Sequence, residues 1–406
     1  MKLETVRQWC SDSALRQTGK VVSLFMFDIP KQVFKIDFKR REERKMKFGE
    51  LKSWQKKRLL FSLLTYVIVI VVFLAYAAVT MYTDKKAEDD YWVSMLQTPK
   101  DIEERAAQFD QNATRVQVGT YVENLKEVNL KTSSFRMVVL IWFKWEGNDN
   151  LDMAKHFRIY KGTINKTETV KNYHENGENY QAVRCDVSIT KNYWNRRFPL
   201  ESHQLRMYVE SELPVDEVVF VNDSENSGVN GSLGISGYDL RRNETGTTMI
   251  EYDNNHGDPE IPGGIINSEH ITALELNRDS MGLYVKCFIA LVGTITWVLI
   301  TLFICTYHRV DPLSMIPAAL FGTVTNIMVG ANLLPDALQL GLLEFVNIFG
   351  IVTILAVAMT IININRIRNK YEDRDFASFY GRIMFYTIVV LVVAGNIILP
   401  ISAYMF

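Results

Sequence analysis

Residues 59–81 read LLFSLLTYVIVIVVFLAYAAVTM, a run without a single charged side chain. A helix needs about 20 apolar residues to cross about 30 Å of hydrocarbon, so this run predicts a membrane-spanning helix. Fifty-eight residues precede the run, far more than the short basic head of a cleaved signal peptide. The sequence therefore predicts a retained N-terminal anchor over residues 59–82.

Further apolar runs follow in the last third of the chain. Three of them, residues 284–306, 340–364 and 383–406, are long enough to span a membrane. A fourth run, residues 313–334, is weaker because it carries polar residues and a proline: Ser314, Pro317, Thr323, Thr325 and Asn326. These runs predict a bundle of four transmembrane helices over residues 281–406.

Basic residues predict the orientation. Residues 31–58 hold twelve Lys and Arg against four acidic residues, which places the tail, residues 1–58, in the cytoplasm. Five spans then put residues 83–280 outside and the basic loop 366–370 inside, whereas four spans would put that loop outside. We therefore count 313–334 as a span of a plasma or bacterial inner membrane protein. The tail is either a simple topology determinant or also a contact for anionic lipid headgroups.

The segment between the anchor and the C-terminal helices has the pattern of strands. Residues 83–114 are polar and are interpreted as a connector. From residue 115 onward, short runs rich in β-branched and aromatic residues alternate with polar turns, without intervening amphipathic helices. Residues 115–122 and 135–145 are the clearest of these runs. Further strand candidates are residues 157–160, 180–189, 205–210, 217–221, 238–242, 247–252 and 270–278. The pattern predicts an antiparallel β-sandwich over residues 115–280, in the extracytoplasmic space.

Cysteines and histidines give no sign of metal or catalytic chemistry. Cys185 is the one cysteine in the predicted sandwich, so no disulfide is available within that domain. The chain has no CxxC or HExxH motif, and its histidines are scattered. We expect no enzyme activity, no cofactor, no metal and no nucleic-acid partner.

One segment resembles a known family. Residues 193–208 read YWNRRFPLESHQLRMY, and this run resembles the signature turn of the pentameric ligand-gated ion channels. In that superfamily an aromatic-Pro-aromatic-Asp segment leads into a strand, and here the segment is Phe198, Pro199, Leu200 and Glu201. The preceding Arg196 and Arg197 are similar to those of the bacterial, proton-gated members, which also lack the Cys-bridged loop.

Other segments follow in the order that the family requires. They are residues 116–121, 135–145, 271–278, 332–335 and 396–400, so the resemblance covers about residues 115–406. The chain departs from the family pattern between Trp145 and Phe198, where the usual Trp-x-Pro is missing, so the family's agonist site is not carried over. The N-terminal anchor also lies outside the family plan.

The resemblance implies a homopentameric, cation-preferring channel for inorganic ions, with the helix 313–334 lining the pore. Helical spacing then places five residues on one stripe: Ser314, Ala318, Phe321, Thr325 and Met328. Phe321 would form an apolar gate, and Asp311 an acidic ring that selects cations. Alternatively, the small and hydroxyl residues pack against other helices, and Asp311 caps the helix before Pro312.

The resemblance also implies a coupling junction between the sandwich and the helices. Its residues are Arg196, Arg197, Phe198, Pro199, Glu201, Arg278, Pro335 and Asp336. The charged members could form ion pairs that differ between closed and open states, or a surface cluster that does not switch.

Four aromatic residues are candidates for a ligand site, because a cation can lie over a ring face: Trp142, Trp145, Tyr238 and Tyr252. Buried aromatics of the sandwich are the alternative interpretation. A second function also stays open, a non-conducting membrane receptor that couples the outer domain to the tail. A receptor has no need for hydroxyl groups and an acidic mouth on one stripe of the helix 313–334.

Overall fold

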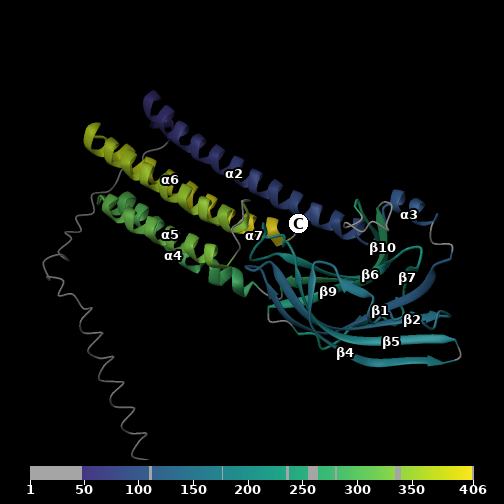
Figure 1. Ribbon diagram of the computed structural model, residues 1–406. Coiled ribbons are helices and arrows are strands. Elements are labelled where there is room, and N and C mark those ends of the chain that lie inside the picture. Colours follow the sequence, from purple (N-terminus) through teal and green to yellow (C-terminus); the bar gives the residue numbers. More distant parts are fainter. Residues whose placement is uncertain are drawn as a thin grey trace, which may run out of the picture. The chain divides into compact units, whose positions relative to one another are not determined.

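The computed structural model describes residues 48–108, 112–175, 177–234, 237–254, 264–278, 281–333 and 340–404, with the backbone alone for 329–333 (Figure 1). All of them belong to one unit, Phe48–Phe406. Most of the predicted tail, and Pro335 and Asp336, lie outside the described residues.

The first long helix, α2 (Ser53–Ser94), follows a short 3-10 turn at Phe48–Glu50. It has 42 residues, which is about 63 Å at 1.5 Å per residue and about twice the thickness of the hydrocarbon core. The helix does not end with the apolar run at Met81. It continues through the segment interpreted as a connector, and a short helix α3 (Lys100–Ala106) follows.

Four helices of the second half continue the chain after the strands. They are α4 (Gly282–Phe303), which runs on as a π-helical turn at Ile304–His308, α5 (Ile316–Leu333), α6 (Leu342–Lys370) and α7 (Arg374–Tyr404). Among the described residues, α2, α4 with its extension, α6 and α7 are long and apolar enough to cross a membrane, and Leu313–Met328 is a shorter apolar helix. The prediction of membrane helices is confirmed at this level, while the number of spans and their orientation stay predictions.

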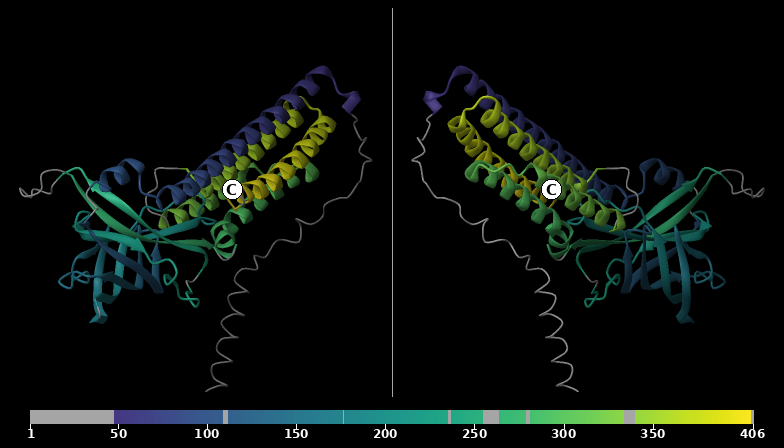
Figure 2. Two further views of the ribbon diagram at one scale, coloured as in Figure 1. Left: turned by 90° about the vertical axis from the view of Figure 1, so that its right-hand side faces the viewer. Right: turned by 90° about the vertical axis from the view of Figure 1, so that its left-hand side faces the viewer.

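Glycines allow close packing between these helices. A Cβ added to Gly350 of α6 would lie 2.8 Å from the Leu291 side chain of α4, and one added to Gly395 of α7 would lie 2.2 Å from the Phe349 ring of α6. Small residues let helix backbones approach in this way. On the other side of α6 and α7, α2 runs alongside both (Figure 2).

The strands between α3 and α4 form two sheets. One has the order β4 (Gly162–Glu175), β5 (Glu178–Thr190), β2 (Ser134–Glu146), β1 (Thr114–Asn129) and β7 (Val218–Asn222), with β8 (Gly228–Val229) also on β1. The other has the order β3 (Phe157–Ile159), β6 (Ser202–Pro214), β10 (Ile265–Arg278) and β9 (Tyr238–Tyr252). Within the described ranges the pairs are antiparallel, except that β1 is parallel to β7 and β8.

The predicted strands are largely present, and the structure differs from the prediction at β4, at β9 and at the two-residue strand β8, which was not predicted. The sequence did not predict β4, whose residues are almost all exposed and therefore lack an apolar alternation. Residues 238–242 and 247–252, predicted as two strands, form the single strand β9, because residues 243–246 between them also pair in register with residues 271–274 of β10.

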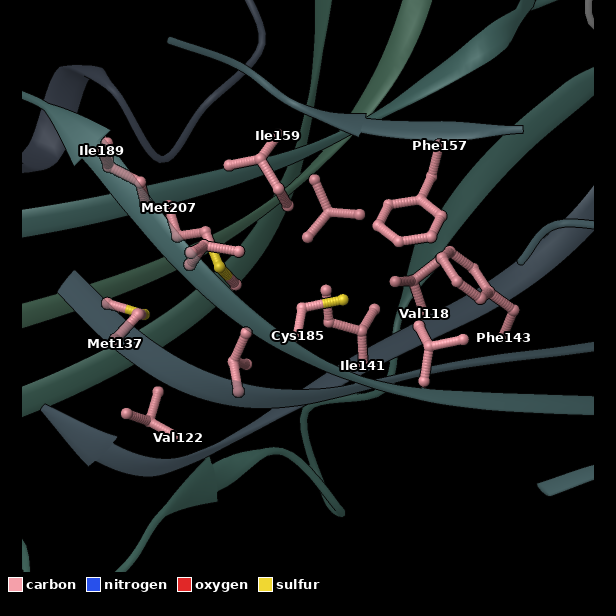
Figure 3. Packing of buried hydrophobic residues seen from close by; sticks show 14 of the residues in the cluster. Val118, Val122, Met137, Ile141, Phe143, Phe157, Ile159, Cys185, Ile189 and Met207 are labelled. Atoms are coloured by element: carbon pink, nitrogen blue, oxygen red, sulfur yellow. The ribbon is translucent and has the colours of Figure 1, made fainter. Parts of the chain in front are cut away.

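One hydrophobic core joins the two sheets (Figure 3). Val118, Ile141 and Phe143 enter it from the first sheet, and Phe157 and Met207 enter it from the second. Burial alternates along most of β2, as expected for a strand with one covered face. By contrast, β6 and β10 are buried at nearly every position, so these two central strands of the second sheet are covered on both faces.

Candidate functional site

The predicted signature segment forms a tight turn that leads into β6. The Phe198 N–H donates to the Asn195 carbonyl at 3.1 Å, and the Leu200 N–H donates to the Arg197 carbonyl at 2.8 Å. The Phe198–Pro199 peptide bond is cis. Phe198 and Leu200 are buried. The apolar side chains therefore anchor the turn and leave its backbone and its two arginines available for contacts. We call residues 195–202 the junction turn.

Glu201 ties the junction turn to the end of β10. Its Oε1 accepts hydrogen bonds from Arg278 Nη2 at 2.8 Å and Arg278 Nε at 3.1 Å, and it lies 3.2 Å from His203 Nε2. The Arg278 guanidinium in turn lies over the Tyr238 ring, 4.0 Å from its centroid. Glu201 and Arg278 of the predicted junction are thus in direct contact, a few residues before α4 begins.

The electrostatics of this cluster favour a charged Glu201. Burial alone would raise its pKa, but the hydrogen bond from His203 and the positive charge beside the carboxylate, permanent in Arg278, lower the pKa to about 2. Burial lowers the pKa of His203. The cluster therefore holds one buried carboxylate against a guanidinium that stays charged at every physiological pH.

The two arginines of the junction turn pair with α2. Arg197 Nη2 donates to Glu88 Oε2 in a short hydrogen bond, and Arg197 and Arg196 each lie 3.7 Å from Asp84. From the sequence, these arginines are instead expected to pair with Glu201 and Asp336. Asp336 lies outside the described residues, whereas Asp84 and Glu88 were assigned to a connector and were not considered as partners.

The junction turn also contacts the bundle. The Leu342 N–H at the start of α6 donates to the Arg196 carbonyl at 2.6 Å. A Cβ at the neighbouring Gly341 would lie 2.5 Å from the same oxygen, so only glycine permits this approach. The turn therefore meets the start of α6 through backbone contacts.

Several residues at this junction were missed by sequence reasoning: Asp84, Lys85, Glu88, Ser202, Gln204 and Glu275. A signal for Asp84 and Glu88 of α2 was nevertheless present. The buried positions of α2 include Leu74, Ala77 and Met81, and they continue at Asp84, Glu88 and Trp92 with the same spacing of three and four residues. The stripe changes its chemistry but not its period, which indicates one helix with one buried face.

The predicted pore stripe lies on the uncovered side of α5. All five of its residues are exposed, with Phe321 74% and Met328 63% accessible. The opposite side is packed: Thr323 is buried, and Asn326 donates through Nδ2 to Asn347 Oδ1 of α6 at 2.8 Å. The exposed face is broader than the stripe, because Leu320, Val324 and Ile327 are also exposed.

Asp311 precedes the 3-10 turn Leu313–Met315 that leads into α5. Its Oδ1 accepts a hydrogen bond from the Leu313 N–H at 3.1 Å, a contact that favours the capping interpretation. The side chain is exposed, and its role in an acidic ring stays a prediction. Pro317 is the second residue of α5, where the missing N–H has no helical partner to lose.

The four aromatic candidates are not gathered into one site within the chain. Trp142 and Trp145 are buried on β2, and their Nε1 atoms donate to Asp223 Oδ2 at 2.9 Å and to the Asn148 carbonyl at 3.3 Å. Tyr238 and Tyr252 stand at opposite ends of β9, which is about 47 Å at 3.4 Å per residue. Tyr238 is buried and Tyr252 is half-buried, and the hydroxyl groups of both make hydrogen bonds, so the structure favours the interpretation as packed, hydrogen-bonded aromatics of the sandwich.

Two neighbouring buried carboxylates lie in the second sheet, distant from Glu201 along β6 and β10. Glu210 of β6 is opposite Glu269 of β10. Glu210 accepts hydrogen bonds from Arg158 Nη2 at 2.6 Å and from the Tyr252 hydroxyl at 2.9 Å. Burial, together with the negative charge of Glu210, raises the pKa of Glu269 to about 8. Among the described residues, no group of three His, Cys, Asp or Glu side chains could hold a metal ion.

Comparison with known proteins adds no relative. No protein-family model matches the chain, and no curated protein matches it. Any function must therefore be argued from the residues and contacts described above.

Proposed function

We propose that the chain is one subunit of a gated ion channel that prefers cations. In this proposal the two sheets form an extracytoplasmic sandwich, α4 to α7 form a transmembrane bundle, and five copies surround one axis. A stimulus at the sandwich opens a pore lined by residues 313–334. The chain has no catalytic role in this proposal and needs no cofactor.

One observation carries the proposal. The side of α5 that bears Thr323 and Asn326 is packed inside the subunit, while the stripe from Ser314 to Met328 is uncovered. A helix that lines a pore needs this division, because one side must face water and the others must face protein. The junction turn supports the proposal, since it contacts both the end of β10 through Glu201 and the start of α6 through Arg196.

Current measurements on purified full-length protein in planar bilayers test the proposal. We expect cation current across a range of pH, with a reversal potential that follows the cation gradient. Phe321→Ala removes the apolar ring and should leak without a stimulus. Val390→Ala, at an exposed position of α7, is a matched control that should behave as the wild type. Silence in every variant, from protein that forms a folded ring, would contradict a channel.

A second function is favoured by α2. This helix begins beside the basic tail, and its other end contacts the second sheet through Glu88 and Gln204. A receptor that signals across a membrane would require such a connection. A folded but silent ring would therefore move the assignment to a non-conducting receptor. Binding of the tail to vesicles of anionic lipid would then be the next measurement.

A further inference from the structure

The outer end of α2 holds the junction turn by a set of buried polar contacts around Glu88. Besides Arg197, Glu88 Oε2 accepts a hydrogen bond from the Ser202 hydroxyl at 3.0 Å. The Glu88 backbone carbonyl accepts another from Gln204 Nε2 at 2.7 Å. Glu88 is 0% exposed and Arg197 is 3% exposed, so both charges are removed from water.

A buried ion pair of this kind binds its elements in one defined arrangement. Removing a charge from water costs several kcal/mol, and the partner offsets this cost only at close range and good geometry. Arg197 therefore strongly disfavours any position of the turn in which Glu88 is out of reach. Asp84, one helical turn earlier, adds attraction for both arginines of the turn.

The other end of α2 is fixed to the connection between α6 and α7. Gln55 Nε2 donates to Asp373 Oδ2 at 2.7 Å, and Arg58 Nη2 donates to Asn363 Oδ1 at 2.8 Å. The Trp54 ring packs against Tyr371, with 5.3 Å between the ring centroids. One continuous helix thus connects the far end of the bundle with the turn that touches the near end of α6.

We propose that Glu88, assisted by Asp84, is a positioning residue that sets how the junction turn meets the start of α6. The N-terminal helix is in this way a working part of the coupling junction and more than an anchor. The claim that this contact controls the opening of a pore rests on the proposed function, whereas the claim that it positions the turn is independent of that function.

Hydrogen–deuterium exchange of the full-length protein in detergent tests the positioning directly. Glu88→Gln keeps the size of the side chain but removes its charge. We expect amides of residues 197–204 and of Leu342 to exchange at least tenfold faster than in the wild type, while the amides of β2 are unchanged. Glu88→Asp, which keeps the charge on a shorter side chain, should give an increase of about threefold, and it serves as the test if Glu88→Gln does not fold.

Two further variants separate positioning from general damage. The charge-swapped pair Glu88→Arg with Arg197→Glu should bring the exchange rates back toward those of the wild type. Asp90→Asn removes an exposed carboxylate two residues along the same helix and should change nothing. Unchanged exchange at Leu342 in both Glu88 variants, or no recovery in the swapped pair, would overturn the inference.

Currents from the same proteins complete the test. If the wild type conducts, open probability at pH 7 should change at least threefold in Glu88→Gln and return in the swapped pair. A silent wild type counts against the proposed channel and leaves the exchange result to decide the positioning role. Altered exchange without any change in open probability would confine Glu88 to positioning the turn and remove it from gating.

Discussion

The two faces of β6 are both buried, yet they are covered by opposite kinds of chemistry. Leu205, Met207 and Val209 face the other sheet inside an apolar core. Gln204 and Arg206, which alternate with them, face α2, where Gln204 meets the Glu88 carbonyl and Arg206 Nη2 donates to the Tyr91 carbonyl at 3.0 Å. Apolar burial and polar burial therefore occur side by side on the two faces of one strand.

Burial has different consequences on the two faces of β6. Apolar burial is non-directional and roughly proportional to area, so neighbours can substitute for each other. A buried charge is stabilised only by a specific partner group at a defined distance, and this stabilisation changes when either group gains or loses a proton. A loss in the core should therefore be insensitive to pH, whereas a loss among the buried carboxylates should depend on pH.

The largest expected effect comes from the core. Phe143→Ala empties a fully buried site between the sheets and should lower the free energy of unfolding by about 3–5 kcal/mol. Chemical denaturation in detergent measures this, and the loss should be equal at pH 5 and pH 8. Val170→Ala on the exposed face of β4 is the control, with less than about 0.5 kcal/mol expected. A strong pH dependence of the Phe143 loss would break the distinction between the two faces.

Glu269 should show the opposite behaviour. Its pKa is raised to about 8 in the folded chain, by burial and by Glu210, from an ordinary value of 4.5. The folded state therefore prefers the neutral acid, and this stability is present below pH 4.5 and is lost as pH rises toward 8. Glu269→Gln should remove this pH dependence. As pH rises from 5 to 8, the free energy of unfolding of Glu269→Gln should therefore increase by about 3–4 kcal/mol relative to that of the wild type.

The matched control for Glu269 is Glu212→Gln, an exposed carboxylate on the same strand as Glu210. Its unfolding free energy should follow the wild type at each pH. Parallel curves for Glu269→Gln and the wild type would show that the carboxyl titrates normally and that the sheet face is open to water.

Glu201 should depend on pH with the reverse sign. Its pKa lies at about 2 in the folded chain, where the contacts with His203 and Arg278 overcome the effect of burial, against an ordinary 4.5. The stabilisation is present above pH 4.5 and is lost as pH falls toward 2. Glu201→Gln should therefore cost about 3 kcal/mol at pH 7 and progressively less in acid. A constant cost at pH 7 and pH 3, measured by denaturation, would assign the effect to lost packing.

The same contrast explains what the sequence could predict. Apolar runs and β-branched alternation predicted the membrane-type helices and most strands, because apolar burial leaves a periodic pattern. The resemblance at Phe198 and Pro199 implies a junction that includes Glu201 and Arg278, and these two residues are in contact. The partners of Arg196 and Arg197 were missed because Asp84 and Glu88 are polar and look like an exposed segment, unless the spacing of the apolar stripe is followed past Met81. The exposed strand β4 was missed for a related reason, since no buried face marks it.

The smallest expected effect concerns Asp311, an exposed charge with a backbone partner. Its carboxylate accepts a hydrogen bond from the Leu313 N–H, so Asp311→Ala should cost about 1 kcal/mol of stability through the lost cap. Asp311→Asn keeps a capping oxygen and should change stability by less than about 0.5 kcal/mol. The two variants separate the cap from the charge, because in the proposed channel both should weaken cation selectivity equally, as read from reversal potentials. If selectivity falls only in Asp311→Ala, the shape of the helix entrance controls it and the acidic ring does not.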